Sequence, residues 1–73
     1  MNVLSLKKGQ KARIETINDP DLGMVLMELG LMPGSEISMV GSAPSGCPLI
    51  LQVEASRIGI RKEEASRIIV SES

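Results

Sequence analysis

The chain has 73 residues and carries eight basic against nine acidic side chains, which gives a formal charge of −1 at pH 7. It contains no phenylalanine, tyrosine, tryptophan or histidine. The balanced charge and the lack of aromatic rings argue against a nucleic-acid-binding surface, because such surfaces use basic grooves and stacking platforms. The lack of histidine excludes Ser-His and Cys-His catalytic arrangements.

The length corresponds to one domain, residues 1–73, near the lower limit for a chain that folds alone. Cys47 is the only cysteine, so no internal disulfide is possible, in keeping with a reducing cytoplasm. Residues 1–8 lack the pattern of a secretory signal, and no apolar run reaches the ~18 residues that a membrane-spanning helix needs. We therefore expect a soluble cytoplasmic protein that reaches a membrane only through a partner, without inserting into it.

The N-terminal part predicts an apolar lead-in, a turn and a first strand. Residues 3–6 are mostly apolar, and Lys-Lys-Gly at 7–9 is typical of a turn. Over residues 10–17 apolar and polar residues alternate, but the alternation slips by one residue between Ile14 and Ile17. This slip predicts a strand that contains a β-bulge or ends early.

The next segment predicts a short helix. Asp19 is placed to cap it, and Pro20 suits its first position. Four residues then recur at the i, i+3, i+4 and i+7 spacing of one apolar stripe: Leu22, Val25, Leu26 and Leu29. Gly23 is unfavourable inside a helix, which suggests that another backbone passes close to it. Met24 and Met27 lie off the stripe, so we expect them at the surface.

Residues 30–34 predict how this helix ends. Gly30 stands where a residue after a helix adopts positive φ, which costs glycine least. Leu31 follows as the apolar residue that contacts Leu26 one turn back. Pro33 cannot continue the helix, and Pro33-Gly34 is typical of a turn before the next strand.

The rest of the chain predicts strands separated by short turns. They are a second strand around residues 37–40, a proline-containing loop at 43–48, strands at 49–53 and 57–61, a helical turn at 62–66 and a last strand at 68–70. The fold expected is mainly β with one or two short helices. It is a small barrel of about five antiparallel strands, with the helix inserted between strands one and two.

Features spread over most of the chain occur in a characteristic order. They are Leu6 with Gly9, Ile14 and Ile17, Leu26 with Leu29-Gly30-Leu31, Pro33-Gly34, Pro44, Gly46 and Pro48, Ile58-Gly59-Ile60-Arg61, Ala65, and Ile68 with Val70. In this order they resemble the FeoA family, small SH3-like barrel proteins associated with bacterial ferrous-iron uptake. One departure is Cys47, because the family usually has an aspartate between the loop glycine and proline. This departure argues against a role for an acidic group in this loop.

The resemblance implies an accessory, regulatory protein that docks on the cytosolic part of a FeoB-like membrane permease, which carries a GTPase domain. Whether docking changes nucleotide hydrolysis, gating or assembly stays open. Related barrels also form the C-terminal domain of iron-dependent repressors, so a freestanding relative of that domain is one alternative. A small nucleic-acid-binding barrel is another. We expect a monomer or a weak homo-oligomer.

The titratable residues do not indicate chemistry of their own. Asp19 and Asp21 are explained by the start of the helix, and Glu63 and Glu64 by a solvated turn, rather than by acid–base catalysis. Cys47 has neither a CxxC partner nor a histidine, so an inert thiol in a turn is favoured over an iron ligand. We expect no enzymatic activity, no cofactor and no metal site.

We therefore expect the chain to bind a partner through exposed apolar surface. Flexible methionine side chains are well suited to form such a surface. The predicted partner contacts surround the helix end and the proline loop: Met24, Met27, Leu31, Met32, Pro44, Cys47 and Pro48. The residues predicted to be structural are Leu22, Val25, Leu26, Leu29, Gly30, Pro33 and Gly34.

Overall fold

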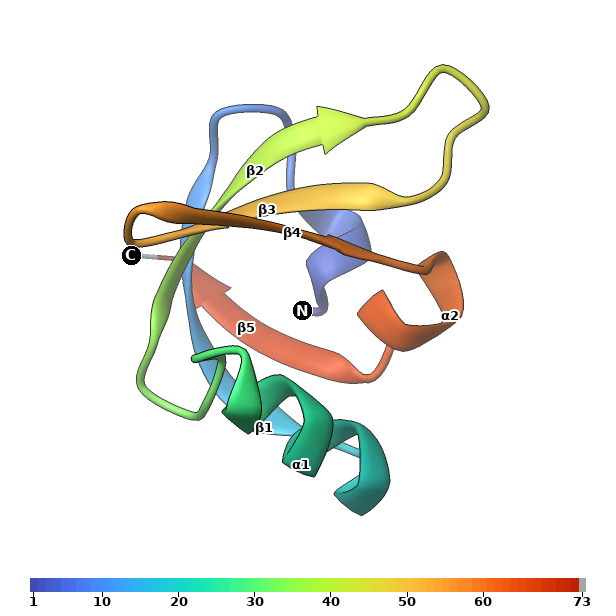
Figure 1. Cartoon of the computed structure of the whole chain (residues 1–73). Helices are drawn as coiled ribbons and strands as arrows, with labels where there is room; N and C mark the ends of the chain where they lie inside the picture. Colours follow the sequence, from blue (N-terminus) through green and yellow to red (C-terminus); the bar gives the residue numbers. More distant parts are fainter. Residues whose placement is uncertain (73) are drawn as a thin grey trace.

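The computed structural model describes residues 1–72. Its elements in chain order are the 3-10 helix η1 (Val3–Ser5), β1 (Lys11–Ile17), α1 (Pro20–Glu28), β2 (Glu36–Ser42), β3 (Leu49–Val53), β4 (Ser56–Ile60), α2 (Lys62–Ala65) and β5 (Ile68–Glu72). Figure 1 shows the strands curled around a common interior, with α1 at one end of the barrel.

All five strands form one antiparallel sheet in the order β4-β3-β2-β1-β5. The predicted fold, including the helix between the first two strands, is confirmed. β4 and β5 stand at the two ends of the sheet, and α2 connects them (Figure 1). The predicted bulge is also present, because the pairing of β1 with β5 shifts register between Ile14 and Thr16.

The core follows from the two-residue period of the strands, which sends alternate side chains inward. Its members are Val3, Leu6, Ala12, Ile14, Leu22, Leu26, Leu31, Ile37, Met39, Leu51, Val53, Ile60, Ala65, Ile68 and Val70. Within residues 1–72 no polar or charged residue is buried, so this interior is held by aliphatic packing alone.

The N-terminal residues are part of the sheet's edge. The Val70 N–H donates to the Met1 carbonyl over 2.8 Å, and Asn2 forms an antiparallel bridge with Ile69. The Asn2 side chain accepts the Leu4 N–H and so caps η1. This arrangement covers the edge of β5 that β1 does not use.

Candidate docking surface

The start of α1 is fixed by the capping predicted from the sequence. Asp19 Oδ1 accepts the N–H groups of Asp21 and Leu22 over 3.1 and 3.2 Å, and Pro20 occupies the first helical position. The other carboxylate oxygen of Asp19 lies 2.9 Å from Arg67 Nη1. The helix start is therefore tied to the segment that leads into β5.

The end of α1 forms a Schellman motif, as the sequence predicts. Gly30 adopts φ +91°, its N–H donates to the Met27 carbonyl, and the Leu31 N–H donates to the Leu26 carbonyl over 2.8 Å. This reversal carries the chain back beneath the helix. Leu31 consequently enters the core, where its side chain is fully buried.

A tight turn follows and holds the residues after the helix. The Ser35 N–H donates to the Met32 carbonyl, while Ser35 Oγ accepts the Met32 N–H. Gly34 adopts φ +94° and its N–H donates to the Ile14 carbonyl over 2.8 Å. The predicted turn at 33–34 is confirmed, and it fixes Met32 beside the end of α1.

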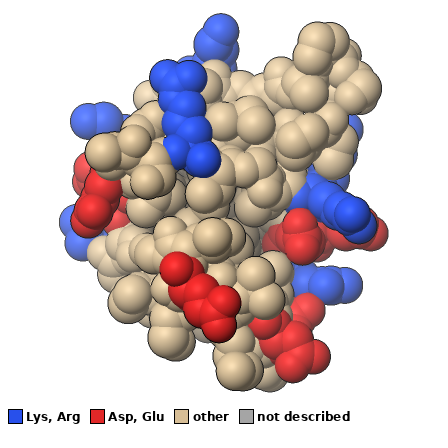
Figure 2. Space-filling model, viewed as in Figure 1, with Lys and Arg blue, Asp and Glu red and all other residues tan. Residues whose placement is uncertain are grey.

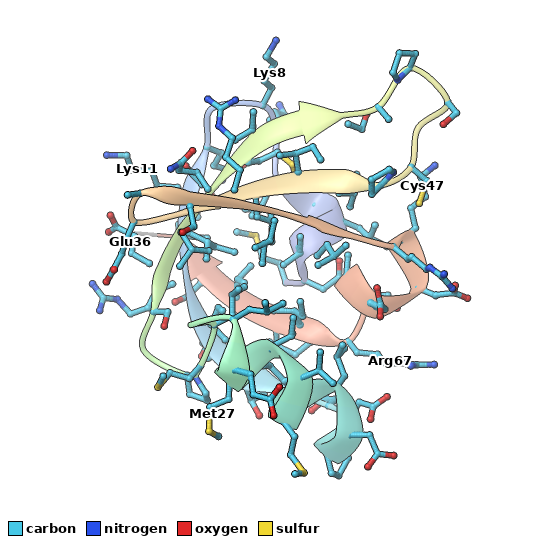
Figure 3. The ribbon with its side chains drawn as sticks, in the orientation of Figure 1. Lys8, Lys11, Met27, Glu36, Cys47 and Arg67 are labelled. Atoms are coloured by element: carbon cyan, nitrogen blue, oxygen red, sulfur yellow. The ribbon has the colours of Figure 1, made fainter. Side chains whose placement is uncertain are left out.

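Five large apolar side chains remain exposed on α1 and just after it, and we call them the α1 patch. Their exposed fractions are 66% for Met24, 55% for Val25, 56% for Met27, 51% for Leu29 and 44% for Met32. Figure 3 shows Met27 pointing away from the barrel. The expected exposure of Met24 and Met27 is confirmed.

The predicted packing stripe is only half right. Leu22 and Leu26 are buried, but Val25 and Leu29 are not. Each of these two follows a buried leucine by three residues, which turns it about 60° to one side of the line that faces the core. The prediction that a backbone passes close to Gly23 is also wrong, because a Cβ built there would meet nothing within 4 Å.

One further prediction about the binding residues needs correction. Leu31 lies in the core as part of the Schellman motif and offers no surface to a partner. The proline loop does not extend the α1 patch, because Met27 and Cys47 lie at opposite ends of the molecule (Figure 3). Pro44, Cys47 and Pro48 are exposed, and their role in binding stays a prediction.

Val25 and Leu29 are the patch residues that the sequence does not assign to binding. A signal for them exists in the helix itself. Apolar side chains occur all around α1, which has only nine residues. A short helix that lies on a barrel covers one face only, so this many apolar residues cannot all be buried.

The charged residues on α1 itself are acidic. Asp21 and Glu28 are exposed on α1, and the last turn of the helix carries no basic residue. In Figure 2, red and tan side chains cover the end of the molecule where α1 lies, while blue ones are spread singly over the rest of that face. Asp21 and Glu28 thus give the α1 patch an acidic border along the helix, while Arg13 lies at the turn after Met32, where its Nη1 donates to the Gly34 carbonyl over 3.2 Å.

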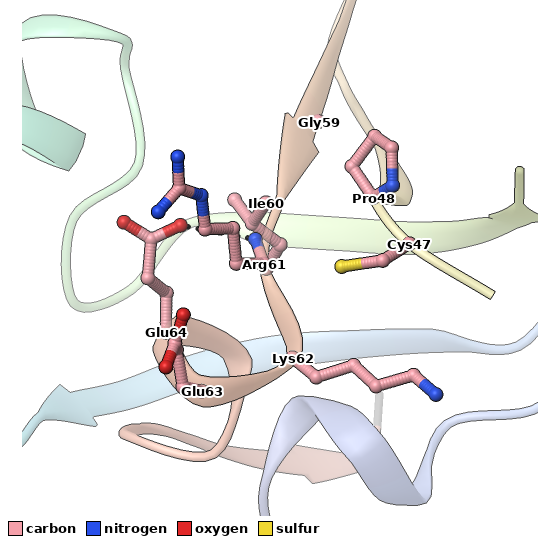
Figure 4. A pocket seen from close by; sticks show the side chains of 8 residues that line it. All are labelled: Cys47, Pro48, Gly59, Ile60, Arg61, Lys62, Glu63 and Glu64. Carbon is pink, nitrogen blue, oxygen red and sulfur yellow. Dashed lines mark hydrogen bonds between the residues drawn. The ribbon is translucent and has the colours of Figure 1, made fainter. Parts of the chain in front are cut away.

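The proline loop borders a separate hollow of about 690 Å³, at the end of β4 (Figure 4). It is lined by Cys47, Pro48, Gly59, Ile60, Arg61, Lys62, Glu63 and Glu64. Nowhere in the described chain do three cysteine, aspartate or glutamate side chains come together in a way that could hold a metal ion. No helix in residues 1–72 has the length and hydropathy to cross a bilayer.

Comparison with protein families agrees with this fold. The FeoA domain model matches residues 1–72. The chain belongs to the FeoA family. A search of the curated proteins gave no match. The FeoA family is associated with ferrous-iron transport, and its solved members are small SH3-like proteins.

Several solved FeoA structures are similar to this chain. Iron(II) transport protein A from Clostridium thermocellum is 34% identical with a TM-score of 0.89, over 99% of this chain but only 45% of that one. The FeoA protein from Chlorobium tepidum is 29% identical with a TM-score of 0.91, over 99% and 70% of the two chains. FeoA from Stenotrophomonas maltophilia, solved with zinc, is 33% identical with a TM-score of 0.84, over 97% and 89%.

For the Stenotrophomonas protein, a role as a ferrous-iron transport activating factor has been suggested. The manganese-activated repressor ScaR also contains this fold, with a TM-score of 0.87 at 20% identity over 35% of its chain. At that identity the likeness shows the fold alone. The expectation concerns related barrels in iron-dependent repressors, and ScaR shows this fold in a manganese-activated one.

Proposed function

We propose that this FeoA-family chain acts as one cytoplasmic accessory domain that docks through the α1 patch on the cytosolic part of a FeoB-like permease. Its role is binding and regulation rather than catalysis. Membership of a family associated with ferrous-iron transport supports this proposal. The α1 patch supplies the surface on which the docking depends.

The observation that carries the proposal is the exposure of five large apolar side chains around one short helix. A chain of this size buries only about 60% of the surface that its unfolded form exposes, so its hydrophobic core is small. The five exposed apolar side chains do not contribute to that core. Contiguous exposed apolar surface on a small protein marks a binding site. Three of the five residues are methionines, whose flexible thioethers adapt to a partner.

The acidic border indicates the kind of surface that the patch fits. Glu28 lies in the last turn of α1, where the helix dipole disfavours a negative charge. A basic group on the partner would compensate for this unfavourable position. We therefore expect the permease to present an apolar surface bordered by lysine or arginine. Two copies of the α1 patch would bring like charges together, which disfavours self-association through it.

The test is the affinity of Met27→Glu for the purified cytosolic domain of the permease, measured by isothermal titration calorimetry with and without guanine nucleotide. Burying a carboxylate in an apolar contact is costly, so we expect binding to weaken at least tenfold, which is about 1.4 kcal/mol. Met24→Glu should have a similar effect. Circular dichroism should show that both variants are folded, because both side chains are exposed.

Leu4→Glu is the matched control. Leu4 is 46% exposed, close to the value for Met32, but it lies on η1 rather than on α1. We expect this variant to bind as the wild type does. Wild-type affinity of a folded Met27→Glu protein, or an equal loss in Leu4→Glu, would reject the α1 patch as the docking site.

A further inference from the structure

β4 is an edge strand with unpaired backbone groups. It pairs with β3 alone, from Val53↔Ser56 at the turn to Leu49↔Ile60. The pair that flanks a two-residue turn is hydrogen-bonded, and hydrogen-bonded and non-hydrogen-bonded pairs then alternate along an antiparallel ladder. The N–H and C=O groups of Arg57 and Gly59 therefore point away from β3.

These four groups form a short window that is closed at both ends. At the α2 end, the Arg61 N–H donates to Glu64 Oε1 over 3.0 Å (Figure 4), and the Arg61 carbonyl accepts the Ala65 N–H. At the turn, the Glu54 carbonyl accepts the Gln52 side-chain amide over 2.7 Å. Within residues 1–72, the backbone of Arg57 and Gly59 makes no hydrogen bond outside the β3–β4 ladder.

The opposite edge of the sheet, on β5, is covered by other residues of the chain. On β5, residues 1 and 2 of the chain cover the outer side, with the Val70 N–H bonded to the Met1 carbonyl. Uncovered edges invite pairing with other chains, and folded proteins usually protect them. The fold covers its β5 edge and leaves the β4 edge open.

Two arginines lie beside the window, while the carboxylates of Glu63 and Glu64 lie beyond its α2 end, where they line the hollow. Arg57 on β4 and Arg61 just after it flank Gly59, and all three residues are exposed. Arg57 Nε donates to Gln52 Oε1 over 3.0 Å, which holds its guanidinium over the β3–β4 pair. The ion pair between Asp19 and Arg67 is the only one in the described chain, so neither Arg57 nor Arg61 has an acidic partner there.

Gly59 is closely covered on its side-chain face, which leaves little space for a side chain at this position. Pro48 lies against it, with its Cβ and Cγ atoms 3.3 Å from the position that a Cβ on Gly59 would take. The hollow lined by Cys47, Pro48 and residues 59–64 opens next to this point (Figure 4). An incoming strand would therefore meet exposed backbone, two arginines and a place for an apolar side chain.

We propose that the β4 edge is a second binding site, which takes an extended acidic segment of another protein as an added strand. Backbone hydrogen bonds to Arg57 and Gly59 would set the register of the added strand. The side chains of Arg57 and Arg61 would favour acidic residues on it. Pairing of two β4 edges is disfavoured because it would bring the arginines of both copies together. Figure 1 places β4 apart from α1, so this site does not depend on the α1 patch.

The experiment is a titration of the isotope-labelled chain with a short blocked peptide of alternating glutamate and valine, followed by NMR of the backbone amides. We expect the amide signals of Arg57 and Gly59 to shift, and their hydrogen exchange to slow at least tenfold at saturation. A peptide with lysine in place of glutamate, and the glutamate peptide N-methylated at every residue, should both fail to bind. Met27→Glu should bind the acidic peptide as the wild type does.

Variants then test the charge preference. Arg57→Glu should weaken peptide binding at least tenfold, whereas Arg13→Glu, the same charge change on β1, should leave it unchanged. Unaltered amides of Arg57 and Gly59 at millimolar peptide would overturn the proposal. So would binding of the N-methylated or lysine peptide with equal affinity, or shifts confined to α1.

Discussion

Gly23 and Gly30 lie seven residues apart and differ in whether the backbone conformation favours glycine. A Cβ added at either one would meet no atom within 4 Å, so sterics with neighbours do not distinguish them. Their backbones do, because Gly23 lies inside α1 and Gly30 has φ +91°. The same substitution at the two positions therefore isolates the backbone contribution to stability.

We predict that Gly23→Ala raises the free energy of unfolding by about 0.5–1 kcal/mol, since alanine is the better helix former. Gly30→Ala should lower it by about 1–2 kcal/mol, since an L-residue is strained at positive φ. Urea denaturation followed by far-ultraviolet circular dichroism measures both, and the lack of tryptophan rules out fluorescence as the probe. Equal effects of one sign would contradict the assignment of the helix end.

Glu54 shows the same constraint without a glycine. It is the first residue of the two-residue turn between β3 and β4, and its φ is +54°. Glycine is the favoured residue at this position of a hairpin turn. The turn thus holds a strained residue at the start of the strand whose outer edge is open.

At the level of elements, α1 is held to the barrel by very few side chains. Leu22 and Leu26 are the only residues of α1 that are buried. Leu26 also accepts the Leu31 N–H through its carbonyl, so it contributes to both the packing and the end of the helix. Apart from the ion pair between Asp19 and Arg67 at its start, the helix that carries the patch is attached through Leu22 and Leu26.

We predict that Leu26→Ala lowers the free energy of unfolding by about 2–5 kcal/mol, the usual cost of a cavity at a buried leucine. That is most of the stability that a domain of this size has, so partner binding should be lost together with the fold. Met24→Ala, on the exposed side of the same helix, should change stability by less than about 0.5 kcal/mol. A stable Leu26→Ala protein with intact α1 would show that the helix is held in another way.

The sequence was informative wherever a feature is set by neighbours along the chain. Asp19 and Pro20 mark the helix start, Gly30 and Leu31 its end, and the slip after Ile14 a bulge, because capping, positive φ and strand period are local effects. The exposure of Val25 and Leu29 depends on which strands lie beneath α1. The spacing of apolar residues along the helix does not show which of them the strands cover.

The relation between the binding regions also required the folded chain. Met27 and Cys47 are twenty residues apart in the sequence and lie at opposite ends of the molecule (Figure 3). The open edge at Arg57 and Gly59 depends on the strand order, in which β4 is last. Strand spacing predicts that β4 exists, but not that it has a neighbour on one side only.

For the molecule as a whole, the two proposed surfaces differ in chemistry as well as in place. The α1 patch is apolar with acidic residues beside it, and the β4 edge is polar with arginines beside it. One partner surface cannot satisfy both. The barrel between them contains no buried polar residue in the described chain, so an aliphatic core separates the two proposed sites.

The thioethers of the α1 patch also make it vulnerable to peroxide. Met24, Met27 and Met32 are open to solvent, whereas Met39 is buried in the core. Conversion to the sulfoxide makes a methionine side chain polar, so oxidative damage would fall first on the surface proposed for docking. Peptide mass spectrometry after brief hydrogen peroxide treatment should find sulfoxide at Met24 and Met27 well before Met39. If Met39 reacted as fast as the other two, the burial described for β2 would be wrong.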